Sequence, residues 1–218
     1  QSFLLNISNK EYLKNYLIET KKIQTIYLPL FLCASVSDIC KKYDVKIGHY
    51  HIDRSLRPIF DLSLKENEYL YIVNYYGQLN DEEIVYWKSK YDNLIVDYSQ
   101  AFFQKPIENI DSIYTCRKFL GVADGAYLYP SSKLQRKLDI DYSFERMHFL
   151  MGRFEKGAND FYNEYVENNR IFKDLPILNM SRLTHNILRG IDYQRIENLL
   201  YGKVDENNKI KTYNFIPM

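Results

Sequence analysis

Hydrophobic positions in the first half of the chain follow two alternating periods. Short runs rich in β-branched and aromatic residues, which are typical of strands, are followed by segments whose apolar residues recur at helical spacing. The strands predicted in this half are residues 23–28, 46–52, 69–73 and 94–96. The helices predicted around them are residues 9–21, 35–43 and 81–90. This alternation predicts an α/β fold in three layers, with a mostly parallel sheet covered by helices on both faces.

The pattern changes after residue 111. Two further strands, 112–114 and 126–129, flank a glycine-containing loop without a helix between them, which predicts an antiparallel edge on the sheet. From residue 142 onward the apolar positions recur at helical spacing. The helices predicted there are residues 142–169, 181–188 and 193–201. These helices either form a separate unit or pack back onto the sheet.

The composition of the 218 residues fits a globular protein, since 46% are hydrophobic and 26% are charged. The 29 basic and 28 acidic residues leave a formal net charge of +1, so no positive field points to nucleic acid or an anionic membrane as a partner. Tyrosine is frequent, with 21 residues. We attribute this excess to codon bias first and to a binding site second.

The chain carries no signal for a membrane or for a metal. No apolar run approaches the roughly 20 residues that cross a bilayer, and the N-terminus lacks a basic stretch followed by an apolar one. The cysteines Cys33, Cys40 and Cys116 are odd in number, and none has zinc-ligand spacing. The sequence therefore predicts a cytoplasmic protein with reduced cysteines and no metal site.

The candidate chemistry lies where predicted strands end, because ligands of α/β sheets bind at the carboxyl ends of strands. Asp97 follows three apolar residues, so its charge is expensive to bury unless it is paired. Arg117 or Lys118 is the structural partner that we expect, and a functional role for Asp97 is the alternative. Lys118 is in turn either a solvated surface charge or a desolvated amine able to form a Schiff base.

The segment 95–101, Ile-Val-Asp-Tyr-Ser-Gln-Ala, resembles the apolar-Asp-Ala-Ala-Gln-Ala motif of the DegT/StrS family of pyridoxal-phosphate-dependent sugar aminotransferases. The resemblance implies that Asp97 pairs with the pyridinium nitrogen of the cofactor and that Gln100 contacts its ring hydroxyl. The segment 117–126 is similar to the family segment in which the Schiff-base lysine precedes a Gly-Gly pair. Lys118 takes the place of that lysine and Gly125 that of the first glycine, while Ala126 stands at the second.

Three weaker pieces complete the resemblance. Residues 74–78, Asn-Tyr-Tyr-Gly-Gln, resemble the family's His-x-Tyr-Gly-Gln stretch, and residues 8–13 resemble the Ser-Gly-x-x-Ala-Leu helix start that holds the cofactor phosphate, with Asn9 at the glycine position. The position that stacks on the cofactor ring corresponds to Cys33, with Phe31 two residues earlier. The resemblance thus implies these further cofactor-binding residues: Ser8, Asn9, Phe31, Cys33, Tyr76 and Thr115.

The resemblance covers roughly residues 5–200 and implies the large domain of a fold-type I enzyme. Residues 1–140 would form the cofactor-binding α/β domain, and residues 141–218 a helical continuation leading toward a small domain that is absent or truncated. The implied catalytic residues are Asp97 and Lys118, and the implied cofactor is pyridoxal 5'-phosphate. The implied activity is amino transfer from a donor such as glutamate to a keto-sugar nucleotide, by a homodimer, in surface polysaccharide biosynthesis. The alternative is a diverged, non-catalytic member of the family that acts as a binding or interaction module.

Overall fold

The computed structural model describes residues 5–7, 17–131, 137–171 and 177–201. Within these residues, the centre of the fold is an eight-stranded sheet with the order β1-β8-β7-β6-β5-β2-β3-β4. The strands are β1 (Leu5–Ile7), β2 (Thr25–Pro29), β3 (Lys46–Ile52), β4 (Pro58–Ile59), β5 (Glu68–Val73), β6 (Leu94–Asp97), β7 (Asp111–Thr115) and β8 (Ala126–Tyr129). The two shortest, β1 and β4, were not predicted, because two or three residues carry no readable alternation.

The sheet is parallel in its interior and antiparallel toward its edges. Strands β3, β2, β5, β6 and β7 run parallel to one another. Strand β8 is antiparallel to β7, and β1 is antiparallel to β8, while β4 folds back on β3. The structure therefore confirms the mostly parallel sheet and its antiparallel strand after the glycine-containing loop.

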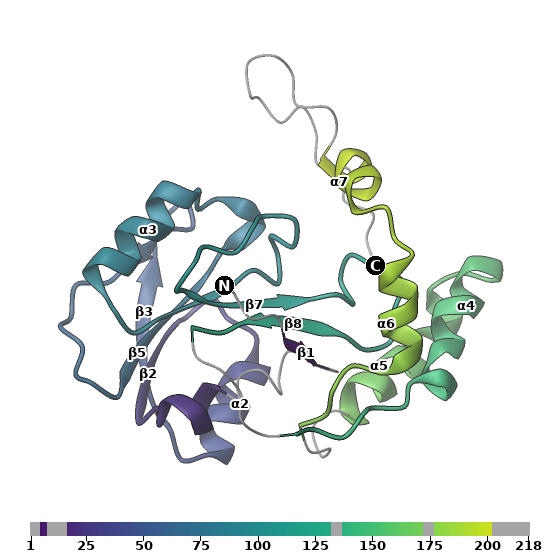
Figure 1. The fold of residues 1–218 in the computed structure, drawn as a ribbon, viewed down its shortest axis with the longest axis horizontal. Helices are drawn as coiled ribbons and strands as arrows, with labels where there is room; N and C mark the ends of the chain where they lie inside the picture. Colours follow the sequence, from purple (N-terminus) through teal and green to yellow (C-terminus); the bar gives the residue numbers. More distant parts are fainter. Residues whose placement is uncertain (1–4, 8–16, 132–136, 172–176, 202–218) are drawn as a thin grey trace.

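Helices cover both faces of this sheet, as Figure 1 shows for α2 and α3 on opposite sides. The helices are α2 (Ala34–Lys42), α3 (Asp81–Lys90), α4 (His148–Glu155), α5 (Tyr162–Ile171), α6 (Arg182–Arg189) and α7 (Tyr193–Tyr201). Residues 17–21 are helical, and residues 9–16 of the helix predicted over 9–21 lie outside the described residues. One core joins α2 to the sheet through residues such as Ile39 and Tyr71, and a second core joins α3 and α6 to it through Trp87 and Leu188. The three-layer α/β prediction is thus confirmed.

The single helix predicted over residues 142–169 is wrong. The structure divides this stretch into the short 3-10 turn η2 (Phe144–Met147), α4, the 3-10 turn η3 (Asn159–Phe161) and α5. The break falls at Gly157, whose φ of 113° lies in the left-handed region that ends helices. Apolar spacing is unchanged across the break, so periodicity alone did not reveal it.

The loop between β7 and β8 attaches the C-terminal helices to the sheet. Asp124 in this loop is fully buried and accepts hydrogen bonds from the backbone N–H and the hydroxyl of Ser181, at 2.9 and 3.0 Å, and from the hydroxyl of Thr184. Ser181 is also the N-cap of α6, because its hydroxyl accepts from the backbone N–H of Thr184 at 3.1 Å. The carboxylate therefore ties the start of α6 to the edge of β8. The division of the chain near residue 140 stays a prediction.

Candidate functional site

The carboxyl ends of the parallel strands β2, β5, β6 and β7 lie at one edge of the sheet. Asp97 is the last residue of β6 and pairs with Ile113 of β7, and Thr115 ends β7 two residues further on. Side chains alternate along a strand, so Asp97 shares the face of Ile95, and Thr115 that of Ile113. Both isoleucines belong to the core under α2. Asp97 and Thr115 thus lie on the α2 face of the sheet edge, and both are buried.

Two hydrogen bonds hold the Asp97 carboxylate in place. The hydroxyl of Tyr71, on the neighbouring strand β5, donates to Oδ2, and the backbone N–H of Ser99 donates to Oδ1 at 2.7 Å. Arg117, one of the ion-pair partners expected from the sequence, donates through Nη1 to Asn169 Oδ1 at 2.5 Å.

The Asp97 charge acts on two tyrosines that remain protonated donors at neutral pH. Burial, and then the Asp97 charge, raise the pKa of Tyr71 well above its ordinary value. The same two causes, in the same order, raise the pKa of Tyr75 to about 12. The contact of Tyr71 with Asp97 comes from the register of β5 on β6, which a single sequence does not reveal.

Several polar atoms at this edge are buried without a hydrogen-bond partner among the described residues. They are Oε1 of Gln100 and Oγ of Ser99, which both follow Asp97, and Oγ of Ser35 in the first turn of α2 after β2. A buried polar group without a partner costs about 1–3 kcal/mol and calls for an explanation, such as a role in ligand binding. The edge therefore offers unused hydrogen-bonding capacity beside a buried carboxylate. Of these atoms, only the Gln100 amide was expected to bind a ligand.

Lys118 lies in the turn that follows β7, and β7 is the strand next to the one that carries Asp97. The side chain of Lys118 is exposed. The turn is held by Cys116, whose carbonyl oxygen accepts from the backbone N–H of Leu120 at 2.9 Å, and whose N–H donates to the carbonyl of Gly125 at 3.0 Å. Gly125 has a φ of 111°, and a Cβ there would lie 3.1 Å from Thr184 Cγ2. A glycine is required at this position for conformational and steric reasons, whether or not a cofactor binds.

The remaining predicted cofactor-binding residues lie at the ends of β2 and β5 or outside the described residues. Phe31 and Cys33 follow β2 and are exposed, with the Phe31 ring 5.5 Å from the Tyr75 ring. Tyr76 is 42% exposed in the 3-10 turn η1 (Tyr75–Gly77) and has a positive φ of 54°. Ser8 and Asn9, the predicted phosphate-binding residues, lie outside the described residues.

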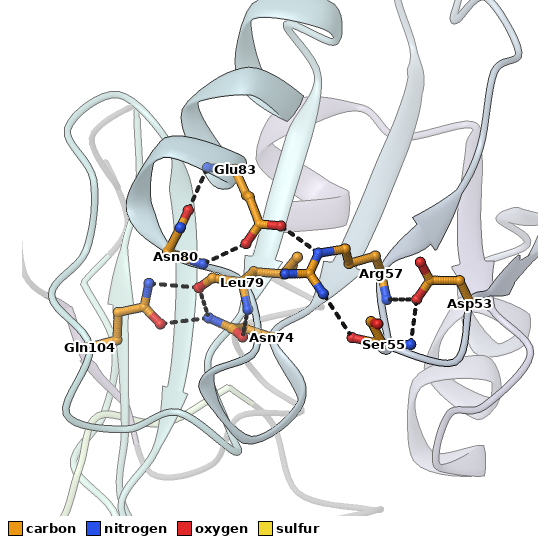
Figure 2. A network of polar contacts seen from close by, with 8 residues as sticks. All are labelled: Asp53, Ser55, Arg57, Asn74, Leu79, Asn80, Glu83 and Gln104. Carbon is orange, nitrogen blue, oxygen red and sulfur yellow. Dashed lines mark hydrogen bonds and ion pairs between the residues drawn. The ribbon is translucent and has the colours of Figure 1, made fainter. Parts of the chain in front are cut away.

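Figure 2 shows the polar network that holds the turn carrying Tyr75 and Tyr76. The fully buried Asn74 side chain donates to the carbonyl of Leu79 at 3.0 Å and accepts from the Leu79 N–H at 3.0 Å. Its amide also donates to Gln104 Oε1 at 2.6 Å. The Asn74 amide therefore closes the turn as a backbone pair would.

The network continues into the start of α3, as Figure 2 also shows. Asn80 and Glu83 form a reciprocal capping box, with hydrogen bonds of 2.9 and 3.0 Å, and Arg57 donates to the second Glu83 oxygen at 2.5 Å. Arg57 lies in the turn between β3 and β4, where its backbone N–H donates to Asp53 Oδ1. The network thus connects the turn after β5 with the start of α3 and with the turn between β3 and β4.

Replacing Asn74 by leucine is expected to lower the free energy of unfolding by about 2–3 kcal/mol, because the N–H of Leu79 and the amide of Gln104 lose buried partners. Urea unfolding followed by circular dichroism measures this change. The matched control is Asn186→Leu on the exposed surface of α6, which is expected to change the free energy by no more than about 0.5 kcal/mol. Equal effects of the two substitutions would contradict a role for the Asn74 network.

Comparison with known proteins gives a fold likeness only. No protein-family profile and no curated protein matches the sequence. Among solved structures, the chain is similar to an L-threonine-O-3-phosphate decarboxylase from Porphyromonas gingivalis, with 14% identity, coverage of 58% of this chain and 44% of that one, and a TM-score of 0.49. It is similar to a histidinol-phosphate aminotransferase from Clostridium acetobutylicum, with 15% identity, coverage of 57% and 44%, and a TM-score of 0.46.

A DegT DnrJ EryC1 StrS aminotransferase from Brucella abortus has 11% identity to this chain, with coverage of 59% of this chain and 42% of that one, and a TM-score of 0.42. The chain spans less than half the length of each of these three proteins. The topology of the chain itself defines its class: an α/β protein with a mostly parallel sheet and a buried carboxylate at the carboxyl edge of its strands. Within the described residues, no helix is both long and apolar enough to cross a membrane.

Proposed function

We propose that this chain is a pyridoxal-phosphate-dependent, aminotransferase-like protein of fold-type I, and that the cofactor binds at the carboxyl edge of β2, β5, β6 and β7. The observation that carries the proposal is the buried Asp97 carboxylate, held by two donors, with the unpartnered Ser99 and Gln100 oxygens beside it. Lys118 follows the next strand of the same sheet. These acceptors fit a heterocycle that carries a protonated nitrogen and a hydroxyl.

In this proposal, each residue of the edge has one task. Asp97 would hold a proton on the ring nitrogen, and the hydrogen bonds from Tyr71 and Ser99 orient its carboxylate. Gln100 would accept a hydrogen bond from the ring hydroxyl through its unpartnered Oε1. Lys118 would supply the amine that holds the cofactor aldehyde, and the same amine would move the proton. Bound pyridoxal phosphate would supply the electron sink that this chemistry needs.

The substrate is the finer part of the proposal. The motifs around Asp97 and Lys118 support a sugar aminotransferase that moves an amino group from a donor such as glutamate to a keto-sugar nucleotide. A cytoplasmic homodimer in surface polysaccharide biosynthesis is the setting that the same motifs support. The exposed position of Lys118 and the Asn9 and Ala126 differences favour a second candidate, a non-catalytic relative that retains cofactor or ligand binding without turnover.

Covalent trapping of the cofactor tests the proposal. The protein is incubated with pyridoxal phosphate, reduced with borohydride and analysed by peptide mass spectrometry. We expect the reduced adduct on the peptide that contains Lys118, no adduct there in Lys118→Ala, and a normal adduct in Lys105→Ala, which removes another exposed lysine. Equal labelling of the Lys118→Ala variant, or labelling scattered over surface lysines, would contradict the proposal.

A second measurement separates the two candidates. Glutamate added to the cofactor-loaded protein should convert the bound pyridoxal form to the pyridoxamine form, which is followed by absorbance. Conversion supports the aminotransferase. Specific labelling at Lys118 without conversion by glutamate or other amino donors supports the non-catalytic relative.

A further inference from the structure

A pocket separate from the Asp97 edge lies between α4, η3, α5 and the loop that carries Lys118. Its volume is about 80 Å³, whereas one water molecule needs about 10–15 Å³, so the pocket has room for a group larger than a single water molecule. Its walls are largely apolar, with the rings of Phe149, Phe161 and Tyr165 among them. The Phe149 and Tyr165 rings meet edge to face at 5.8 Å. The shape suits a small ligand with an apolar or aromatic body.

One wall of the pocket depends on a glycine. A Cβ at Gly152 in α4 would lie 2.1 Å from the Phe161 ring, which is much closer than two non-bonded carbon atoms can approach. Glycine therefore allows the Phe161 ring to rest directly on the α4 backbone. The close contact fixes the position of the ring that lines the pocket.

The polar side chains that line the pocket belong to two arginines, one asparagine and two tyrosines, Tyr162 and Tyr165. Arg117 and Arg153 line it, and no carboxylate is among its described lining residues. Arg153 is half-buried and makes no hydrogen bond or ion pair within the described part of the chain. Arg117 is bonded to Asn169 at the same end of α5. The electrostatic balance of the pocket therefore favours an anion.

Asn168 adds an unused acceptor. It is only 3% exposed, and its Nδ2 donates to the carbonyl of Ala123 at 2.9 Å, while its buried Oδ1 has no hydrogen-bond partner among the described residues. A buried carbonyl oxygen in this state can accept from an O–H or N–H of a ligand. Arg153 thus favours an anionic group on the ligand, and Asn168 favours an O–H or N–H group on the same molecule.

We infer that this pocket binds a small organic acid with an apolar, preferably aromatic body and a hydroxyl or amino group. The acid pairs with Arg153, the body contacts the aromatic walls, and the hydroxyl or amino group donates to Asn168 Oδ1. Because Asn168 is bonded to Ala123 and Arg117 precedes Lys118, the ligand contacts the residues that hold the Lys118 turn. Occupancy therefore stabilises the loop over residues 116–125. This inference does not depend on the proposed cofactor chemistry.

The test uses para-hydroxybenzoate as the probe and titration calorimetry on the full chain. We expect the probe to bind, and para-hydroxybenzyl alcohol, which keeps the ring and the phenol but lacks the charge, to bind at least about tenfold more weakly, as expected for the loss of one charge-assisted hydrogen bond. Arg153→Gln should weaken the acid by a similar factor and leave the alcohol unchanged. Arg170→Gln, on the exposed side of α5, should leave both unchanged.

Hydrogen exchange gives a second readout. The probe should slow amide exchange over residues 116–125 in the wild type and not in Arg153→Gln. No binding at millimolar probe, equal binding of the acid and the alcohol, or unchanged binding to Arg153→Gln would each overturn the inference. Displacement of the probe by pyridoxal phosphate would also overturn it, because the two sites would then be one. Failure of Lys118 labelling, by contrast, bears only on the proposed function.

Discussion

Asp124→Ala is expected to lower the free energy of unfolding by about 3–5 kcal/mol. The carboxylate is fully buried, and it accepts the backbone N–H and the hydroxyl of Ser181 and the hydroxyl of Thr184. Alanine leaves these buried donors without an acceptor and removes the negative charge from the N-terminus of α6, where the helix dipole favours it. Thermal unfolding should show a fall in the midpoint of about 10 °C.

Two variants serve as controls for Asp124. Asp124→Asn keeps the shape and one acceptor oxygen, so we expect a loss intermediate between those of the wild type and the alanine variant. Asp160→Ala removes an exposed carboxylate from η3 and should change the free energy by no more than about 0.5 kcal/mol. A loss below about 1 kcal/mol for Asp124→Ala would mean that α6 is held to the sheet by apolar packing alone.

Raising the pH above about 10 is expected to unfold the protein in one cooperative step. Burial is the main cause that raises the pKa of many tyrosines here, and the most strongly affected are Tyr50, Tyr71, Tyr98, Tyr114 and Tyr127. The pKa of Tyr75 is raised to about 12. These phenols therefore stay protonated in the folded state at a pH at which the unfolded chain has lost their protons.

The sign of the effect follows from proton linkage. Above pH 10 the folded state binds more protons than the unfolded state, so the free energy of unfolding falls as the pH rises. Each fully buried tyrosine lowers it by about 1.4 kcal/mol per pH unit. Several such tyrosines exhaust the ordinary stability of a domain, about 5–15 kcal/mol, between about pH 10 and 12. Below pH 10 their contribution is fully present.

Absorbance of the tyrosinate and far-ultraviolet circular dichroism, recorded over the same alkaline titration, check this prediction. The buried phenols should ionise in the same step in which the secondary structure is lost. Tyr86→Phe, which changes an exposed tyrosine of α3, should leave the alkaline midpoint in place. Ionisation of all tyrosines with the circular dichroism unchanged would show that the phenols are accessible in the folded state.

The tyrosine excess shows how tertiary structure changes the meaning of a composition. The sequence indicates codon bias first and a binding site second, because it does not tell a buried tyrosine from an exposed one. In the fold, the Tyr98 and Tyr114 rings stack with their centroids 4.9 Å apart. The Tyr50 hydroxyl donates to the backbone carbonyl of Tyr71, and the Tyr71 hydroxyl donates to the Asp97 carboxylate. The residues are core components with satisfied or buried hydroxyls, and their effect on stability appears at high pH.

The C-terminal half shows where helical periodicity fails. The spacing predicts one helix over residues 142–169, because apolar residues recur every three to four positions on both sides of Gly157. The left-handed backbone at Gly157 ends α4, and η3 then turns the chain so that Phe161 packs on Gly152. This contact also forms a wall of the pocket between α4 and α5, so the sequence pattern did not predict the pocket.

The sequence by itself determined the class of the fold and the edge of the sheet at which the candidate site lies. Alternating strands and helices require a parallel sheet, and parallel strands place Asp97, Thr115 and the Lys118 turn at one edge, whatever the details of packing. Only the tertiary structure decided which groups meet there. Tyr71 reaches Asp97 through the register of neighbouring strands, and Asp124 reaches α6 across 57 residues of chain. Such contacts join distant segments through side-chain geometry, which local propensity and spacing do not encode.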